Sequence, residues 1–197
     1  MSNAATYLTK RQRDKHRGMK DVVDLEKARL DLAAKKAYRN WASKFDESFS
    51  SETKLSHLSL RSLVFLAQAK EKSPFYLYDL IMNLLNLGSG FEFNELQSKQ
   101  KMAVVDRYLF LLDRIRFEYM KRLGWLERYP GEDSTLVDFV VRFEELAPGL
   151  QTKPPLLSRN HPDYEKFSEL GEFEKEEFIR KLIPKALKEI QDSSTTL

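Results

Sequence analysis

Apolar positions recur with a helical period along most of this chain. The longest such run extends from Asn94 to Leu123 and contains neither proline nor glycine. Asn94 and Gln97 have the spacing of a capping box, and Gly124 follows at the position where a left-handed residue commonly ends a helix. The pattern therefore predicts one helix over residues 94–123, roughly 45 Å long at about 1.5 Å per residue.

Polar side chains occupy only a narrow stripe of this predicted helix. With about 100° of rotation per residue, the stripe lies within about 40° of one line. It consists of Gln100, Arg107, Arg114, Glu118 and Lys121. A helix that is apolar on most other sides needs neighbours on several sides. We therefore expect it at the centre of a bundle, with this stripe facing water.

Three charged residues fall outside that stripe, on the side predicted to be apolar: Asp106, Asp113 and Arg116. Because an unpaired buried charge is costly, Asp113 and Arg116 should pair with each other or with a neighbouring helix. Such a pair would fix the register of the bundle. The functional alternative is a polar pocket around these three residues that holds a charged ligand.

Shorter helical patterns flank the long one and end at glycines and prolines. The first, 21–45, has one apolar stripe on the inner side and a shorter one, Leu25, Ala28 and Leu32, on the far side. Further helices are expected over 55–69, 74–87, about 134–146, 162–170 and 172–190, with an extended strap over 150–161. Pro148 should end the helix over 134–146, and Pro184 should kink or split the last.

The predicted fold class is therefore all-α: an irregular bundle of about six to seven helices around residues 94–123, without a sheet. At 197 residues the chain suits one domain. We expect a basic, partly disordered tail over 1–20, a helical domain over 21–190, whose first helix is free to project or to mediate oligomerisation, and a tail over 191–197.

Composition narrows the setting. No run of eighteen apolar residues occurs, so no membrane span is expected, and the polar N-terminus has no secretory signal. The absence of cysteine fits a reducing compartment, and we expect a cytoplasmic protein.

Charge is distributed unevenly along the chain. Lys and Arg outnumber Asp and Glu by 12 to 5 in residues 1–45, whereas acids outnumber bases by 15 to 10 in residues 127–197. A basic front and an acidic rear favour attraction within the chain, between subunits, or toward separate partners. The basic segment 10–39 is also a candidate nucleic-acid contact through Arg11, Arg13, Lys15, Arg17, Lys20 and Lys27. No aromatic or glycine-rich recognition motif accompanies these residues, so a solvated helix face is the simpler interpretation.

No catalytic, cofactor or metal-binding signature occurs. The histidines His16, His57 and His161 lack the helical spacing of metal ligands. A phosphate loop must follow a strand, and no strand is predicted before Gly88-Ser-Gly90. Asp79, Asn83 and Asn86 form a polar stripe on helix 74–87, which we interpret as a solvent-facing edge rather than a cation site. We therefore expect no cofactor and no metal, and these observations favour a non-catalytic protein over an enzyme.

The leading functional hypothesis is a non-catalytic protein that acts through protein–protein contacts, as an adaptor or as a homo-oligomeric scaffold. Its basis is the surplus of apolar helix surface, which commonly marks interfaces. The alternatives are nucleic-acid binding through segment 10–39, and a ligand sensor or enzyme built around Asp106, Asp113 and Arg116.

Overall fold

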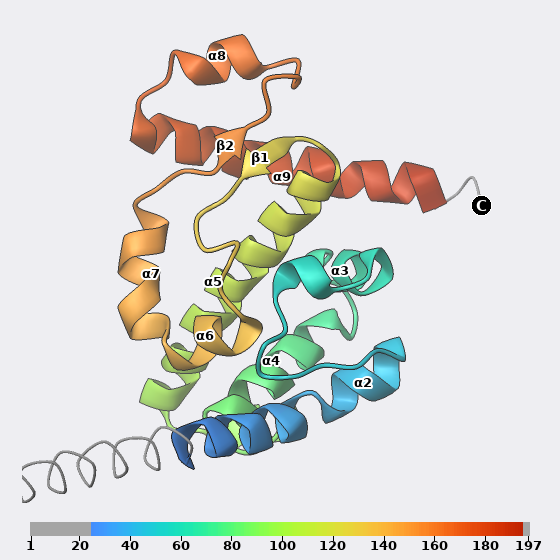
Figure 1. Ribbon diagram of the computed structural model, residues 1–197, viewed down its shortest axis with the longest axis vertical. Helices are drawn as coiled ribbons and strands as arrows, with labels where there is room; N and C mark the ends of the chain where they lie inside the picture. The colour runs from blue at the N-terminus through green and yellow to red at the C-terminus, as the bar shows by residue number, and fades with distance from the viewer. Residues whose placement is uncertain (1–24, 195–197) are drawn as a thin grey trace, which may run out of the picture.

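The computed structural model describes residues 25–194, with side chains as far as residue 189, and within that range it is an all-α protein (Figure 1). Residues 25–37 are helical and continue, after a turn at Tyr38, into α2 (Arg39–Phe45). Then follow η1 (Leu55–His57), α3 (Leu60–Ala67), α4 (Ser73–Leu84), η2 (Gly90–Glu95), α5 (Ser98–Arg122), β1 (Leu126–Arg128), α6 (Leu136–Val141), α7 (Phe143–Gln151), β2 (Leu156–Leu157), α8 (Tyr164–Ser168) and α9 (Glu172–Ser194).

The predicted central helix is confirmed as α5, an unbroken helix of 25 residues. It contacts α3, α4, α6, α9, η1 and β1, and in Figure 1 it runs diagonally through the molecule between them. Gly124 ends it in a left-handed conformation, with the N–H of Trp125 bonded to the carbonyl of Met120, as the sequence predicts. The start was predicted four residues too early, because residues 90–95 form the separate 3-10 helix η2 and Gln97, rather than Asn94, is the N-cap.

The prediction of a water-facing stripe on this helix is wrong. Arg107, Arg114 and Glu118 are buried, whereas Leu109, assigned to the apolar side, is 54% exposed. The stripe is covered by the chain that follows α5, because β1, the loop after it and α6 fold back onto it. Helical periodicity separated the polar face from the apolar one but could not reveal what covers each face.

Helix 25–45 packs as its main apolar stripe predicts. Ala34, Ala37, Trp41 and Phe45 are buried against the rest of the bundle. The Trp41 Nε1–H donates to the carbonyl of Tyr76 at 2.9 Å, which fixes this helix to α4. The second, shorter stripe stays uncovered, with Leu25 65% and Leu32 72% exposed.

Several predicted boundaries differ in the structure. The helix expected over 134–146 divides at Arg142 into α6 and α7, and α7 continues through Pro148 to Gln151. The last helix runs without a split across Pro184 and reaches Ser194, where a tail was expected. The helical backbone therefore continues through both prolines, although each lacks a backbone donor.

The strap predicted over 150–161 contains β2, which pairs with β1 in an antiparallel sheet that joins Leu126 to Leu157. The prediction of no sheet missed these two short strands. None of the helices in residues 25–194 has the length and apolar composition that crossing a bilayer requires.

The central position of α5 predicts a large difference between two neighbouring leucines. Leu111 is fully buried, so Leu111→Ala should lower the free energy of unfolding by about 2 to 5 kcal/mol. Leu109→Ala, on the exposed side of the same helix, should change it by less than about 0.5 kcal/mol. Urea unfolding followed by circular dichroism measures both, and equal losses would contradict the orientation of α5.

Candidate functional site

Four arginines of α5 donate to backbone carbonyls of the elements around the helix. Arg107 Nε bonds the carbonyl of Val140 in α6, Arg114 Nη1 that of Pro130 and Arg116 Nε that of Ala67 in α3, at 3.0, 3.1 and 3.2 Å. Arg122 bonds the carbonyls of both Leu58 and Leu55, at 2.7 and 3.1 Å. Carbonyls at helix ends and in turns lack a partner within their own element. The charges of α5 therefore supply the missing donors.

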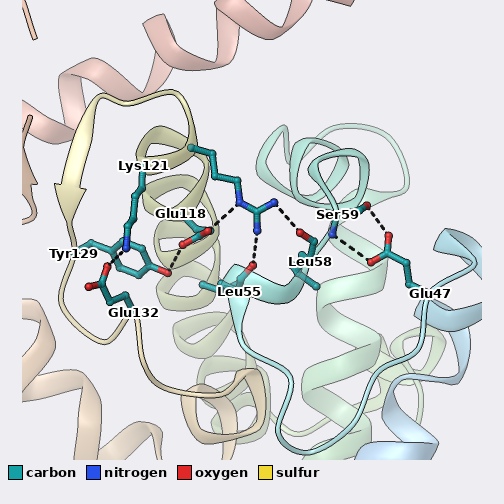
Figure 2. A network of polar contacts seen from close by, with 9 residues as sticks. Glu47, Leu55, Leu58, Ser59, Glu118, Lys121, Tyr129 and Glu132 are labelled. Atoms are coloured by element: carbon teal, nitrogen blue, oxygen red, sulfur yellow. Dashed lines mark hydrogen bonds and ion pairs between the residues drawn. The ribbon is translucent and has the colours of Figure 1, made fainter. Parts of the chain in front are cut away.

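Figure 2 shows the part of this network around Glu118. Glu118 is 4% exposed, and its two carboxylate oxygens accept from Arg122 Nε at 2.9 Å and from the Tyr129 hydroxyl at 3.0 Å. Burial and the neighbouring Glu118 carboxylate raise the pKa of Tyr129, so this hydroxyl stays a donor. Each carboxylate oxygen has a partner, so Glu118 joins Arg122 of α5 to Tyr129 beyond the end of the helix.

A second polar contact in the same view fixes the start of α3 (Figure 2). Glu47 accepts from the hydroxyl of Ser59 at 2.6 Å, from its N–H at 3.3 Å and from the hydroxyl of Ser62. Burial raises the pKa of Glu47, but these hydrogen bonds outweigh it and leave the pKa below its ordinary value. The charged form of Glu47 therefore stabilises the start of this helix.

The three residues of the predicted polar pocket have separate surroundings. Asp106 is exposed. Asp113 pairs with Arg180 of α9 at 2.7 Å, and Arg116 bonds the end of α3. None of the three lines the groove or the cleft described below.

Arg114 is the most unusual charge in the core. Its Nε has no hydrogen-bond partner, and burial lowers its pKa to about 10. The guanidinium lies 4.8 Å from the ring centroid of Phe110 and 5.3 Å from that of Phe117. Contacts with aromatic faces of this kind stabilise a cation in a partly dry environment.

Of the polar stripe predicted on helix 74–87, Asn86 is exposed as predicted and Asn83 is half-buried, but Asp79 is buried, which corrects the interpretation for that residue. Asp79 is 1% exposed and accepts from Asn40 Nδ2 at 2.6 Å, Asn83 Nδ2 at 3.1 Å and the N–H of Gly90 at 2.9 Å. A Cβ atom at Gly90 would lie 3.1 Å from the backbone nitrogen of Asp79, so glycine allows this close approach. Asp79 thus joins three segments. Within residues 25–194, no cluster of His, Asp and Glu has the arrangement of a metal site.

Most of the predicted nucleic-acid contacts, Arg11, Arg13, Lys15, Arg17 and Lys20, lie outside the described residues. Lys27 lies within them and is exposed on helix 25–37. Further along the same helical stretch, Arg29, Lys35, Lys36 and Arg39 are also exposed. The described part of the basic front is therefore a cationic helix surface.

These cations border a groove of about 1010 Å³ between residues 29–42 and the end of α4. The groove is lined on its apolar side by Leu32, Ala33, Ala42 and Leu84. Its charged border consists of Arg29, Lys35, Lys36 and Arg39. Two amides, Asn83 and Asn86, complete it. We call this feature the basic groove; it combines exposed apolar surface with charge of a single sign.

A second cleft, of about 610 Å³, lies between the loop after β1, the strap before β2 and the start of α9. Charges of both signs line it, including Arg128, Lys153 and Glu172. Two of its acids already have partners, since Glu132 pairs with Lys121 and Asp133 with Lys54. The cleft selects no ligand charge, so the basic groove is the better candidate site.

Comparison of the chain with protein-family models, curated proteins and solved structures gave no match. The case for the basic groove therefore rests on its own geometry. The sequence contained one signal for it, the second apolar stripe at Leu25 and Leu32. It contained none for the α4 side, because Asn83, Leu84 and Asn86 resemble any helix end.

The network around Glu118 predicts a structural rather than a chemical role. Glu118→Ala should lower the free energy of unfolding by about 2 to 3 kcal/mol, because it leaves Arg122 and Tyr129 without their shared acceptor. This is less than the loss expected for a fully buried ion pair, because Arg122 is partly exposed. Urea unfolding measures the change. Glu177→Ala, which breaks an exposed pair with Lys181, is the control and should leave the unfolding midpoint unchanged. A neutral Glu118→Ala variant would contradict this role.

Glu47 predicts a loss of stability in acid. Its pKa is lower in the folded chain than in the unfolded one, whose ordinary value is about 4.3. The stabilisation is therefore complete above that value and is lost as pH falls through the folded pKa. In Glu47→Gln, the loss of stability between about pH 5 and pH 3 should be smaller than in the wild type. Thermal unfolding across this range tests it, with Glu52→Gln, in the same loop, as the control; an unchanged profile in Glu47→Gln would contradict the assignment.

Proposed function

We propose that this protein is a non-catalytic interaction module whose basic groove binds an acidic, amphipathic helical segment of a protein partner. The observation that carries the proposal is the combination in one groove of an apolar lining and a border of four cations. We also place its action in the cytoplasm, which the lack of cysteine supports.

Exposed apolar surface supports a protein as the partner. Leu32, in the groove, and Leu25, one heptad earlier, are both more than half exposed on the same helix. Contiguous exposed apolar side chains of this kind mark interaction sites. A helix that lays its apolar face into a groove between two helices is a recurring mode of peptide recognition.

The charge of the groove indicates the sign of the charge expected on its partner. Residues 25–45 contain six cations and only two acids, Glu26 and Asp31. A symmetric contact between two copies of this face would place Arg29 and Lys36 against their own equivalents, and such like-charge contacts are unfavourable. A segment rich in Glu or Asp, by contrast, would gain both apolar burial and ion pairs.

Nucleic acid is the second candidate, because the same exposed cations would also attract phosphates. The two partners differ in what they need from Leu32. Phosphate contacts depend on cations and on salt concentration. An apolar side chain on the groove surface adds nothing to them, whereas an amphipathic helix depends on it.

A defined peptide separates these possibilities. The probe is a fluorescent helical peptide of two heptads, with leucines on one face and glutamates elsewhere, compared with a scrambled peptide of the same composition. We expect the amphipathic peptide alone to bind, and Leu32→Ser or the double variant Arg29→Glu/Lys36→Glu to raise its Kd at least about tenfold, which corresponds to about 1.4 kcal/mol. Fluorescence polarisation measures this.

Controls of the same chemistry lie outside the groove. Met102→Ser removes an exposed apolar side chain of α5, and Lys185→Glu/Lys188→Glu reverses two exposed charges of α9; both should bind as the wild type does. Equal binding of the two peptides would overturn the proposal. Tight binding of duplex DNA that Leu32→Ser leaves unchanged, without binding of the peptide, would favour the nucleic-acid alternative.

A further inference from the structure

We propose that the basic groove binds the start of α9 from a second copy of this chain, so that copies associate head to tail. This inference rests on the proposed function of the groove and names its partner. The sequence divides into a basic front and an acidic rear, and the structure presents each as an exposed surface with an apolar centre.

The acidic surface surrounds Phe173 in the first turn of α9. Phe173 is 84% exposed, the largest value among the exposed large hydrophobic residues described. Exposed carboxylates flank it: Glu172, Glu174, which accepts from the N–H of Gly171, and Glu177, which pairs with Lys181. We call these four residues the acidic knob. Over residues 165–177 there are six glutamates and two lysines, which is the reverse of the charge balance over residues 25–45.

A side-chain hydrogen bond at the start of α9 fixes the position of the acidic knob. The N–H of Gly171 donates to the Glu174 carboxylate at 2.9 Å, which anchors the first turn. Phe173 and Glu177 are four residues apart and therefore share one face of α9. A single rigid face thus presents an aromatic side chain beside a carboxylate.

The groove has the complementary order on its own helix. Leu32 lies between Arg29 and Lys36, three and four residues away, so an apolar side chain is flanked by cations. The groove volume of about 1010 Å³ accommodates an aromatic ring with its neighbours. Insertion of Phe173 beside Leu32 would bury both exposed apolar side chains and bring carboxylates toward Arg29 and Lys36.

The positions of the two surfaces make this a contact between chains. In Figure 1, helix 25–45 lies at one end of the long axis, and α9 lies toward the other end, beneath α8. The groove and the knob of one molecule therefore do not meet. A contact between different surfaces of successive copies is heterologous, and such contacts form open chains, or rings where the rotation closes.

The test begins with the full-length protein and light scattering after size-exclusion chromatography. Mass should rise with concentration up to roughly 100 µM, where contacts of micromolar Kd are populated. Phe173→Ser and Leu32→Ser should each raise the dissociation constant for self-association at least about tenfold. Met102→Ser, another exposed apolar residue, is the matched control and should associate as the wild type does.

Mixing two variants tests the head-to-tail geometry. A Phe173→Ser chain keeps its groove, and an Arg29→Glu/Lys36→Glu chain keeps its knob. Each alone should self-associate at least about tenfold more weakly than the wild type, and at concentrations where neither associates alone the mixture should form a one-to-one dimer that does not grow further. A symmetric contact would show no such complementation. A mixture that forms no dimer would therefore overturn the inference.

The remaining outcomes separate this inference from the proposed function. A wild-type chain that is monomeric at roughly 100 µM but whose groove binds the acidic peptide would overturn self-association and leave the groove assignment intact. If Phe173→Ser does not weaken self-association, the assignment of the acidic knob as the contact surface is wrong. Loss of both peptide binding and self-association would end both proposals.

Discussion

The fold depends on one long helix that supplies hydrogen-bond donors to the carbonyls of its neighbours. The elements around α5 are short, several of them one or two turns, and each ends with backbone carbonyls that have no partner of their own. Arginine suits this position because its planar group offers several donors in fixed directions, as Arg122 shows by reaching two carbonyls and Glu118 at once. Without these donors, burial of such irregular chain against an apolar helix would leave polar groups unsatisfied.

This arrangement explains why charges lie in the core of a protein with an otherwise ordinary apolar interior. Arg107, Arg114 and Glu118 are buried because β1, α6 and the connecting loop pack over them. The ion pairs and aromatic contacts around these side chains compensate for the loss of water. The buried charges of α5 therefore belong to folding, whereas the basic groove and the acidic knob lie on other elements, in helix 25–45, the end of α4 and the start of α9.

The fold class and the central helix could be predicted from the sequence, because α5 has 25 residues of unbroken helical period and a glycine at its end. The inner stripe of helix 25–45 could be predicted for the same reason. The burial of Arg107, Arg114 and Glu118 could not be predicted, because local periodicity contains no information about which distant segment covers a polar face. Of the basic groove, Leu32 could be anticipated, but Leu84 and Asn86 enter it only through the packing of α4 beside helix 25–45.

The position of Arg122 has a consequence for local motion. Its guanidinium connects Leu55 of η1 and the following Leu58 with Glu118, which in turn holds Tyr129 beyond the end of α5. Opening of η1 would remove the carbonyl partners of Arg122, which in turn holds Glu118 in place for Tyr129. Release of Tyr129 would expose Glu118, the acceptor that orients Arg122. These two segments, about seventy positions apart along the chain, should therefore open and close as a single cooperative unit, and neither of them lines the basic groove.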